Sequence, residues 1–561
     1  MEITEFYHIM GKLGKASIQQ YVINLGRYYF KLKSIESNDY IEPTNSELIE
    51  KGSKVLERMF DLDLVTKEYQ SDTTKSMSLV VPTIPLDQLY EHTIKEYNHM
   101  FSDKPISLDL QQSKLGKYTY SLGLNGTYTT FSKSNEEVIS KLCSISLRVN
   151  RSYSIKRRTP KKGSIDINYR TQTTLFRKTL KEYEDKHIHL MWQYDARGRM
   201  YPRAYTLNPH GCQWQKVQLE FARQEKITDR GLIWLKRDIA SNYGLDKENH
   251  EVKEDWFDSH EKDILDLKKS FVDRASSKLM FLRAVEAYKN AINDKPIGLP
   301  VSLDSTSSSI QLMSLLSRDQ HTARLTNIGD SSNREDFYLY LTDKLFSYLD
   351  RERSKEKIHN ARDIIKKCGM IFTYNGMSKI KELLPDDEVR QAFLDILSKE
   401  ATGVCQVQDL INESFIVAKD NPFMEWSMPD GMHIKIPQIT NEYLKYKTMY
   451  FNVSFKMDTV GCDFDANKRS LAPNYIHSID SYICRQMILR SPCDIIPIHD
   501  CYQVHPNYCD ETLSNYNNIL NEISNSDLLG DNIRQIRGER FTNPFLDKPQ
   551  LNTLKCKYSI C

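Results

Sequence analysis

Paired cysteines, long apolar runs and a large net charge are all missing from this sequence. Its eleven cysteines are scattered and form no CxxC pair, which argues against a disulfide framework and favours a reducing compartment. No apolar run approaches the roughly 18 residues that a membrane-spanning helix needs. The N-terminus has neither the basic start nor the continuous apolar core of an export signal. We therefore expect an intracellular protein with no membrane partner.

The net charge of +2, from 77 basic and 75 acidic residues, gives the chain no overall attraction to polyanions. One local exception is the segment 148–170, "RVNRSYSIKRRTPKKGSIDINYR", which has eight basic residues, one acidic residue and interleaved aromatics. Such a segment suits contact with a phosphate backbone. A solvated, mobile loop is the alternative interpretation.

The organisation of the chain changes near residue 186. Its 561 residues, 40% of them hydrophobic, suffice for several domains. Before residue 186, helix-like pieces such as 46–70 alternate with Pro-punctuated extended pieces such as 79–90. After it, short β-like runs precede helical stretches, which predicts an α+β or mixed domain whose sheet presents carboxylates at strand ends.

Two such carboxylates belong to Asp304 and Asp500. Asp304 ends the run "IGLPVSLD", and Ser305 to Ser307 then supply N-cap residues for a helix. Asp500 closes the run "IIPIH" before a predicted turn. Either aspartate alone is weak evidence, since most such residues form turns or caps. If their strands are neighbours, the pair offers the hard oxygen ligands that two magnesium ions need for an in-line phosphoryl displacement.

A helix between the two aspartates offers complementary groups. In "ARDIIKKCGMIFTYNG", Arg362, Lys366, Met370 and Tyr374 recur every four residues and share one helical face. Lys366 and Tyr374 would lie about 12 Å apart along the axis. Cations at one end could then hold a triphosphate while the aromatic ring at the other meets the sugar and base. The alternative is an amphipathic surface helix with solvated cations.

Taken in order, these elements resemble the single-subunit RNA polymerases of bacteriophages and mitochondria, relatives of the family A DNA polymerases. The matching motifs are "DSTSSSIQ" at 304–311, the Arg-x3-Lys-x7-Tyr helix, and "HDC" at 499–501 where the family has "HDS". "DARGR" at 195–199 resembles the Asp-x-x-Gly-Arg element that lies on template and product. "APNYIHS" at 472–478 resembles "APNFVHS", and "WSMPDGMHIKIPQ" from Trp426 resembles the segment that leads into the promoter-specificity hairpin.

The resemblance implies a fold and an activity. The fold would be α+β and mostly helical, a right-hand polymerase with palm, fingers and thumb and a small antiparallel palm sheet carrying the metal aspartates. Residues 1–185 would form a reduced N-terminal and thumb-like region, and residues 186–561 the catalytic palm and fingers domain. The implied activity is DNA-directed RNA synthesis, with two-metal transfer of nucleotides from ribonucleoside triphosphates to the 3′ end of RNA on a DNA template.

The resemblance also implies a role for each matching residue. Two Mg²⁺ ions would be bound by Asp304, the backbone oxygen of Ser305 and Asp500. The catalytic residues would be Asp304, Asp500, Lys366 and Tyr374. The incoming nucleotide would contact Arg362, Lys366, Met370, Tyr374 and His477, the last two reading the ribose. Template and RNA would contact Asp195, Arg197, Arg199 and His499.

Ser309 and Met370 favour ribonucleotides. Family A DNA polymerases have a glutamate at the first position, which blocks the 2′-hydroxyl, and an aromatic residue at the second. The small side chain of Ser309 leaves room for the hydroxyl. The sequence departs from the family at Asn375 and Gln503, which replace common glycines, and in its C-terminal segment, to which we assign no active-site role.

Fewer than 200 residues precede "DARGR", so we expect a reduced promoter domain and a single-stranded-DNA-binding or other accessory protein that delivers melted template. A compact phage enzyme in the host cytoplasm is the expected source, in preference to a mitochondrial one.

Other interpretations remain open. His499, Cys501, His505 and Cys509 are zinc-ligand types, although their spacing is that of no standard finger. No G-x-S-x-G elbow supports a catalytic triad. A family A-like DNA polymerase and a catalytically silent, polymerase-derived nucleic-acid-binding protein are the alternative functions.

Overall fold

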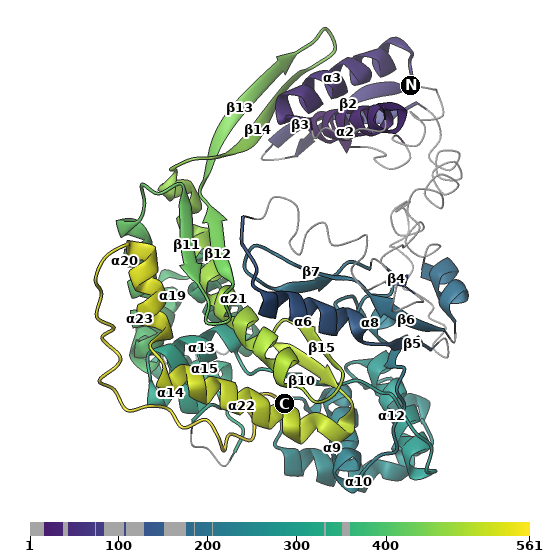
Figure 1. Ribbon diagram of the computed structural model, residues 1–561, viewed down its shortest axis with the longest axis vertical. Coiled ribbons are helices and arrows are strands. Elements are labelled where there is room, and N and C mark those ends of the chain that lie inside the picture. Colours follow the sequence, from purple (N-terminus) through teal and green to yellow (C-terminus); the bar gives the residue numbers. More distant parts are fainter. Residues whose placement is uncertain are drawn as a thin grey trace. The chain divides into compact units, whose positions relative to one another are not determined.

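The structure is a computed structural model (Figure 1). It describes Met10 and residues 16–37, 43–72, 75–83, 106–107, 128–150, 176–184, 186–204, 206–329, 333–349 and 360–561. The chain divides into two compact units. The first comprises residues 1–104, 156–182 and 439–460, and the second comprises residues 105–155, 183–438 and 461–561.

The first unit contains two closely packed helices, α2 (Ile18–Ser37) and α3 (Asn45–Asp61). Glycines allow their close approach, because a Cβ at Gly52 would lie 1.9 Å from the Val22 carbonyl oxygen. A capping box starts α3: the Thr44 hydroxyl oxygen accepts from the Glu47 N–H, and the Glu47 carboxylate accepts from the Thr44 N–H.

A sheet and a hairpin complete the first unit. The sheet has the order β1 (Ala16–Ser17), β3 (Lys75–Pro82), β2 (Val65–Asp72), and the hairpin consists of β13 (Ile439–Lys447) and β14 (Asn452–Val460). Phe451, Val453 and Phe455 share one hydrophobic core with residues of α2, α3 and the sheet. The hairpin is therefore part of the core of the N-terminal region.

One local prediction fails in this unit. We expected helix-like structure through residue 70, but α3 ends at Asp61 and the chain turns at Asp63, whose φ is 53°. The β-branched Val65 and Thr66 then favour the strand β2. The basic segment 148–170 lies outside the described residues except for its first three positions, so its contact with phosphates stays a prediction.

The second unit contains small antiparallel sheets. One has the order β4 (Ile106–Ser107), β6 (His187–Leu190), β5 (Leu147–Val149), β9 (Leu219–Phe221), and another has the order β10 (Val301–Asp304), β16 (Cys501–Val504), β15 (Ile495–Ile498). The two-stranded pairs are β7 (Trp192–Tyr194) with β8 (Met200–Pro202) and β11 (Phe423–Ser427) with β12 (His433–Pro437).

Helices form most of the second unit. Those before β10 are α6 (Lys133–Ser144), α8 (Gln213–Lys216), α9 (Asp229–Ala240), α10 (His250–Leu265), α11 (Lys269–Val272) and α12 (Lys278–Ile292). Those after it are α13 (Ser308–Leu316), α14 (Gln320–Leu325), α15 (Phe337–Tyr348), α17 (Ala361–Thr373), α18 (Met377–Leu383), α19 (Asp387–Glu400), α20 (Thr402–Val417), α21 (Phe464–Arg490), α22 (Cys509–Asn525) and α23 (Leu528–Arg537).

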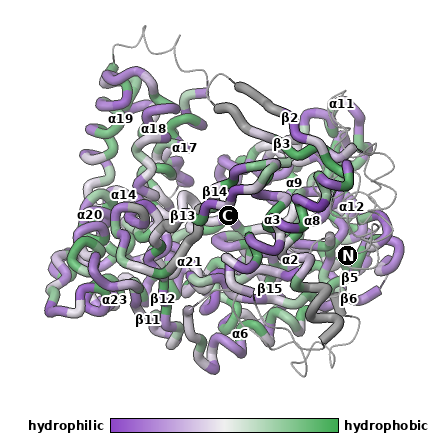
Figure 2. The backbone as a smooth tube through the Cα atoms, turned by 90° about the horizontal axis from the view of Figure 1, so that it is seen from above, coloured by the Kyte–Doolittle hydropathy of each residue, from purple (hydrophilic) through white to green (hydrophobic). Residues whose placement is uncertain are grey.

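Hydrophobic and hydrophilic stretches alternate along α19 (Figure 2), as expected of a helix that buries one face. In contrast, α13 is buried along its length from Ser309 to Leu316 and packs against α20, α21 and α22. Among the described residues, no helix is both long and apolar enough to cross a membrane.

The predicted class, mostly helical with small antiparallel sheets, is confirmed. The assignment of palm, fingers and thumb, and the boundary at residue 185, stay predictions.

Candidate active site

Asp304 and Asp500 are carried by the same three-stranded sheet. β10 and β15 both pair antiparallel with β16, and Asp304 lies directly opposite Cys501. Asp500 occupies the two-residue turn between β15 and β16, where His499 adopts a left-handed φ of 59°. Buried apolar side chains anchor the three strands: Val301, Leu303, Ile495, Ile496, Tyr502 and Val504. The strands are thus neighbours, as the proposed pairing of the two aspartates requires.

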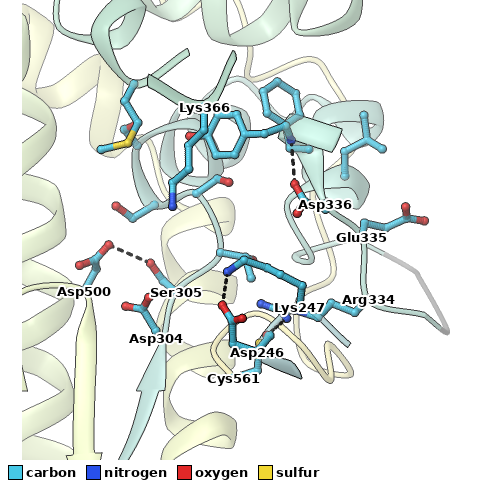
Figure 3. A pocket seen from close by; sticks show the side chains of 18 of the residues that line it. Asp246, Lys247, Asp304, Ser305, Arg334, Glu335, Asp336, Lys366, Asp500 and Cys561 are labelled. Carbon is cyan, nitrogen blue, oxygen red and sulfur yellow. Dashed lines mark hydrogen bonds and ion pairs between the residues drawn. The ribbon is translucent and has the colours of Figure 1, made fainter. Parts of the chain in front are cut away.

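Both carboxyl groups face one pocket of about 230 Å³ (Figure 3). Protein atoms crowd the Asp304 carboxyl, although it stays open to the pocket. This loss of hydration, together with the negative charge of Asp500, raises the pKa of Asp304 to about 7. The cationic Lys247, Lys366 and Arg334 oppose the shift without cancelling it. The cations that line the pocket therefore offset the burial of Asp304 and its repulsion from Asp500 only in part.

Ser305 ties the end of β10 to the turn that carries Asp500. Its hydroxyl donates to Asp500 Oδ2 at 3.2 Å, and its N–H donates to the Asp500 carbonyl at 3.1 Å. The predicted capping role of the serines is wrong at Ser307, which occupies the N-cap of α13 in a left-handed conformation with no side-chain capping bond. These small polar residues line the pocket instead.

Helix α17 supplies another wall of the pocket. Arg362, Lys366, Met370 and Tyr374 all line it, with Tyr374 as the C-cap residue. Figure 3 shows the Lys366 ammonium group pointing into the pocket on the side of Asp500. The four side chains therefore lie on the helical face that lines the pocket of the two aspartates. This placement argues against the alternative of a surface helix whose cations face only solvent.

Arg362 is already engaged by a partner that sequence reasoning missed. Its Nε and Nη2 donate to Asp336 Oδ2 at 2.9 and 2.5 Å. Asp336 also caps α15, because its other oxygen accepts from the backbone of Tyr338 and Leu339. This pair fixes the orientation of the guanidinium at the edge of the pocket.

Tyr374 and His477 form a contact at the other end of α17. His477, on α21, places its ring in an edge-on contact with that of Tyr374, with centroids 5.4 Å apart, and His477 Nε2 lies 3.3 Å from Tyr374 Oη. Burial raises the pKa of Tyr374, so its hydroxyl keeps its proton. Nearby, Thr373 Oγ1 donates to the Oγ of the buried Ser309 at 3.2 Å.

Asn375 explains one departure from the family pattern. It adopts a φ of 55°, in the left-handed region that glycine favours and that asparagine tolerates best among other residues. Its side chain donates to Asn412 at 2.8 Å and accepts from Gln408 at 2.6 Å. The turn after Tyr374 is therefore formed without glycine at this position.

Asp195, Arg197 and Arg199 lie in the turn between β7 and β8, beside α21, and they do not line the pocket. The Asp195 carboxylate accepts from the backbone N–H groups of Arg197 and Arg199, each at 2.9 Å, and from the Arg197 side chain. Arg199 pairs with Asp480 at 2.8 Å. Gly198 has a φ of 80°, and a Cβ there would lie 2.6 Å from Arg485 Nη1.

His499 also lies outside the pocket lining. Its ring forms T-shaped contacts with the rings of Tyr201 and His210, and the ring centroids lie 5.1 Å apart in each pair. His210 Nε2 lies 2.7 Å from the Pro497 carbonyl. Burial, followed by the charge of Arg199, lowers the pKa of His499.

Further residues that the sequence did not single out line the pocket, among them Lys247, Arg334 and Cys561. Lys247 follows Asp246 in the connection between α9 and α10. Arg334 joins this connection to the chain before α15, because its N–H donates to Asn249 Oδ1 at 2.8 Å. No motif marks either cation.

The C-terminal segment, to which the sequence assigned no active-site role, reaches the strand that carries Asp304. The Cys561 N–H donates to the Asp304 carbonyl at 3.0 Å, and the Asp304 N–H donates back at 3.4 Å. Ser305 and Ile560 form an antiparallel bridge beside them. The segment therefore extends the sheet on the free side of β10.

The zinc alternative finds no support. Both His505 nitrogens have partners, since Nδ1 accepts from the Asn507 N–H at 3.3 Å and Nε2 lies 3.1 Å from the Ile297 carbonyl. Within the part of the chain that the structure describes, no three His, Cys, Asp or Glu side chains gather to hold a metal ion. Asp304 and Asp500 offer hard oxygen donors, the ligand type that Mg²⁺ prefers and that differs from the nitrogen and sulfur ligands of most zinc sites.

Comparisons with known proteins agree with this geometry. A family model described as DNA-dependent RNA polymerase matches residues 225–378 and 353–537, which together span more than half of the chain. A probable DNA-directed RNA polymerase from Gelasinospora sp. (strain G114) is 20% identical over 560 residues, covering 86% of this chain and 64% of that protein. The mitochondrial DNA-directed RNA polymerase of Homo sapiens is 25% identical over 386 residues, covering 59% of this chain and 31% of that protein.

The chain spans less than two thirds of the length of these relatives. Several of them, including DNA-directed RNA polymerase 1B of Nicotiana tabacum, carry the word mitochondrial in their names. The expected phage origin and cytoplasmic location are therefore not supported, and a mitochondrial-type relative is at least as good a comparison. The alternatives of a DNA polymerase and a silent protein are not favoured. The chain belongs to the DNA-dependent RNA polymerase family, of the single-subunit type known from phages and mitochondria.

Proposed function

We propose that this protein is a DNA-directed RNA polymerase that transfers nucleotides from ribonucleoside triphosphates to the 3′ end of RNA. The observation that carries this proposal is the pocket that unites Asp304 and Asp500 with Lys366 and Tyr374. Membership of the RNA polymerase family supports it independently.

Asp304 and Asp500 would bind two magnesium ions, with the backbone oxygen of Ser305 as a further ligand. When bound, the ions supply Lewis-acid stabilisation to the attacking and leaving oxygens of a phosphoryl transfer. The fit rests on the chemistry of the donors: two crowded carboxylates, one with its pKa raised to about 7 because the nearby cations only partly offset its burial and the charge of Asp500.

Lys366 is the side chain best placed to bind the triphosphate, because its ammonium group points into the pocket (Figure 3). Arg362 would add a second cation, oriented by Asp336. Lys247 faces the same pocket from another element and would hold the outer phosphates. Fixed cations of this kind neutralise the charge that builds up on the leaving pyrophosphate.

Tyr374, His477 and Met370 would bind the sugar and base of the incoming nucleotide. Ser309 is small and already bonded to Thr373, so it leaves space where a larger side chain would meet the 2′-hydroxyl. His499 would lie near the RNA 3′ end, and the turn 195–199 near template and product.

The experiment is nucleotide addition to a pre-annealed RNA–DNA scaffold, which removes any need for a promoter. Wild-type protein with Mg²⁺ should extend the RNA by template-directed addition of ribonucleotides and should use deoxyribonucleotides far less well. Preferential use of deoxyribonucleotides would favour a DNA polymerase instead, and scaffold binding without addition would favour a silent protein.

The need for an accessory protein is a separate proposal. Initiation on premelted or single-stranded promoter DNA should greatly exceed initiation on linear duplex DNA, and a single-stranded-DNA-binding protein should raise the latter. Accurate and equally efficient initiation on duplex DNA by the protein alone would contradict it.

A further inference from the structure

Arg197 connects the turn between β7 and β8 to the sugar end of the pocket. Its Nη1 lies 3.2 Å from His477 Nδ1, and His477 Nε2 lies 3.3 Å from Tyr374 Oη. The three side chains come from the turn, from α21 and from the end of α17, all within the second unit. They form a continuous line of hydrogen-bonding groups that ends at the pocket.

The chemistry of the groups sets the direction of these hydrogen bonds. A guanidinium can only donate, so His477 Nδ1 accepts from Arg197. A neutral imidazole that accepts at Nδ1 carries its proton on Nε2, and Nε2 then donates to Tyr374 Oη. Burial and the neighbouring Arg199 and Arg197 lower the pKa of His477 to about 3, which keeps the ring neutral.

The Tyr374 hydroxyl can still donate one hydrogen bond. Its oxygen accepts the hydrogen bond from His477 Nε2–H, so its own O–H has to point elsewhere, and Tyr374 lines the pocket. The hydroxyl is therefore oriented as a donor to an acceptor inside the pocket.

Arg197 is itself held rigidly. Its Nε and Nη2 donate to Asp195 Oδ2 at 2.9 and 2.5 Å, which leaves Nη1 for His477. Its carbonyl accepts from the Ser481 hydroxyl at 2.8 Å, which fixes the turn to α21. Two separate interactions, one with Asp195 and one with Ser481, thus hold Arg197 in position to contact His477.

We propose that Arg197 is a positioning residue for sugar selection: it fixes the His477 tautomer that makes the Tyr374 hydroxyl a donor to the ribose 2′-oxygen. This inference rests on the proposed function and deepens it. A ribonucleotide supplies the acceptor, whereas a deoxyribonucleotide leaves the Tyr374 proton unpaired in a partly dehydrated site. Arg197 acts through His477 and Tyr374 without touching the nucleotide.

The test measures kcat/KM for a ribonucleotide and for the matching deoxyribonucleotide on the RNA–DNA scaffold, for each variant. Arg197→Met removes the donors at similar length, and Arg197→Lys keeps a donor that can reach Nδ1. Arg223→Met is the matched control, because the Arg223 side chain is 71% exposed and its ion pair with Glu225 lies outside the pocket lining. Misfolded protein lowers both rates equally and cancels from the ratio.

Arg197→Met should lower the ribo-to-deoxyribo ratio about tenfold, which is about 1.4 kcal/mol, through loss of ribonucleotide addition. Arg197→Lys should retain most of the wild-type ratio, and Arg223→Met should leave the ratio unchanged. Tyr374→Phe should lower the ratio similarly, and adding Arg197→Met to it should lower it no further, because both changes act on one hydroxyl.

If Arg197→Met lowered kcat/KM equally for the ribonucleotide and the deoxyribonucleotide, the inference would be overturned and Arg197 would be assigned to template or product binding. Additive loss of selectivity in the double variant would overturn it as well. A wild-type protein that extends no scaffold would overturn the proposed function itself, and this inference with it.

Discussion

Asp304 lies directly opposite Cys501, the residue that follows Asp500, in the antiparallel pair of β10 and β16. The register of this one strand pair therefore sets the distance between the two carboxylates, and a slip of one residue would turn Asp304 to the other face of the sheet. Burial, followed by the charges of Asp304 and Asp500, raises the pKa of Cys501 well above its usual range. The thiol thus stays neutral beside the two acids.

Lys247→Met tests the cation that the sequence did not reveal. Because Lys247 lines the pocket but its side chain is 46% exposed, we expect it to add binding energy to the triphosphate without entering the bond-making step. The KM for the nucleotide should rise about tenfold with kcat within about twofold. Steady-state extension kinetics measure both. The control is Lys379→Met, an exposed lysine outside the pocket, and equal kinetics for the two variants would refute the assignment.

Arg485→Met tests the buried ion pair that supports the 195–199 turn. Arg485 and Asp430 are 0% and 2% exposed, with Nε and Oδ2 2.5 Å apart. Removing one partner leaves a buried, unpaired charge, so we expect a loss of about 3–5 kcal/mol in the free energy of unfolding. Chemical denaturation measures it. Arg490→Met on the same helix breaks a more exposed pair with Glu522 and should cost less than about 1 kcal/mol. Similar costs for both would contradict the prediction.

His250→Gln tests a source of acid sensitivity. Burial lowers the pKa of His250 to about 3 from the 6.5 of an unfolded chain. Between these values the unfolded state binds more protons, so stability falls as the pH drops below 6.5. From pH 7 to pH 5 the wild type should lose about 2 kcal/mol more than the variant. Urea denaturation at both pH values checks this, with His187→Gln, at an exposed position, as control. If the wild type and His250→Gln lost the same unfolding free energy between pH 7 and pH 5, His250 would not be a source of the acid sensitivity.

Phe451→Ala tests whether the 439–460 hairpin stabilises the N-terminal region. Phe451 is 3% exposed in the core of the first unit, and its ring centroid lies 6.2 Å from that of Phe60. Truncation should cost about 3–5 kcal/mol. Hydrogen exchange should accelerate in β2 and β3 and stay unchanged in β10. Tyr443→Ala, at a 63% exposed site of the same hairpin, should have little effect. Unchanged exchange in β2 and β3 would show that the hairpin does not stabilise that unit.

The features that sequence reasoning found are local. Asp304 and Asp500 each end a short apolar strand, and the four residues of α17 repeat with the helical period, so their chemistry is visible within about ten to fifteen positions. The pattern after residue 186 also predicted an α+β or mixed domain, because periodicity distinguishes strands from helices wherever a segment buries one face. The mostly helical class with small antiparallel sheets was implied by the resemblance to the polymerase family.

The features that it missed depend on distant partners. Asp336 pairs with Arg362, and Cys561 extends the sheet beside Asp304. No residue spacing in the sequence predicts either contact. Arg197 was assigned to template and product because a motif marks its position. Its bond to His477, 280 residues away, follows only from the packing of the turn against α21. The hairpin at 439–460 joins residues near the N-terminus for the same reason.

The most direct measurement of the central claim is RNA extension on the scaffold by Asp304→Asn and Asp500→Asn as the Mg²⁺ concentration is varied. Each change keeps the shape but removes a charged ligand, so addition should fall at least about a thousandfold while scaffold binding stays within about twofold. Asp465→Asn, at an 87% exposed position, should behave as wild type. If either variant at Asp304 or Asp500 extends RNA at the wild-type rate and with the same Mg²⁺ dependence, the two aspartates do not form the metal site of a polymerase.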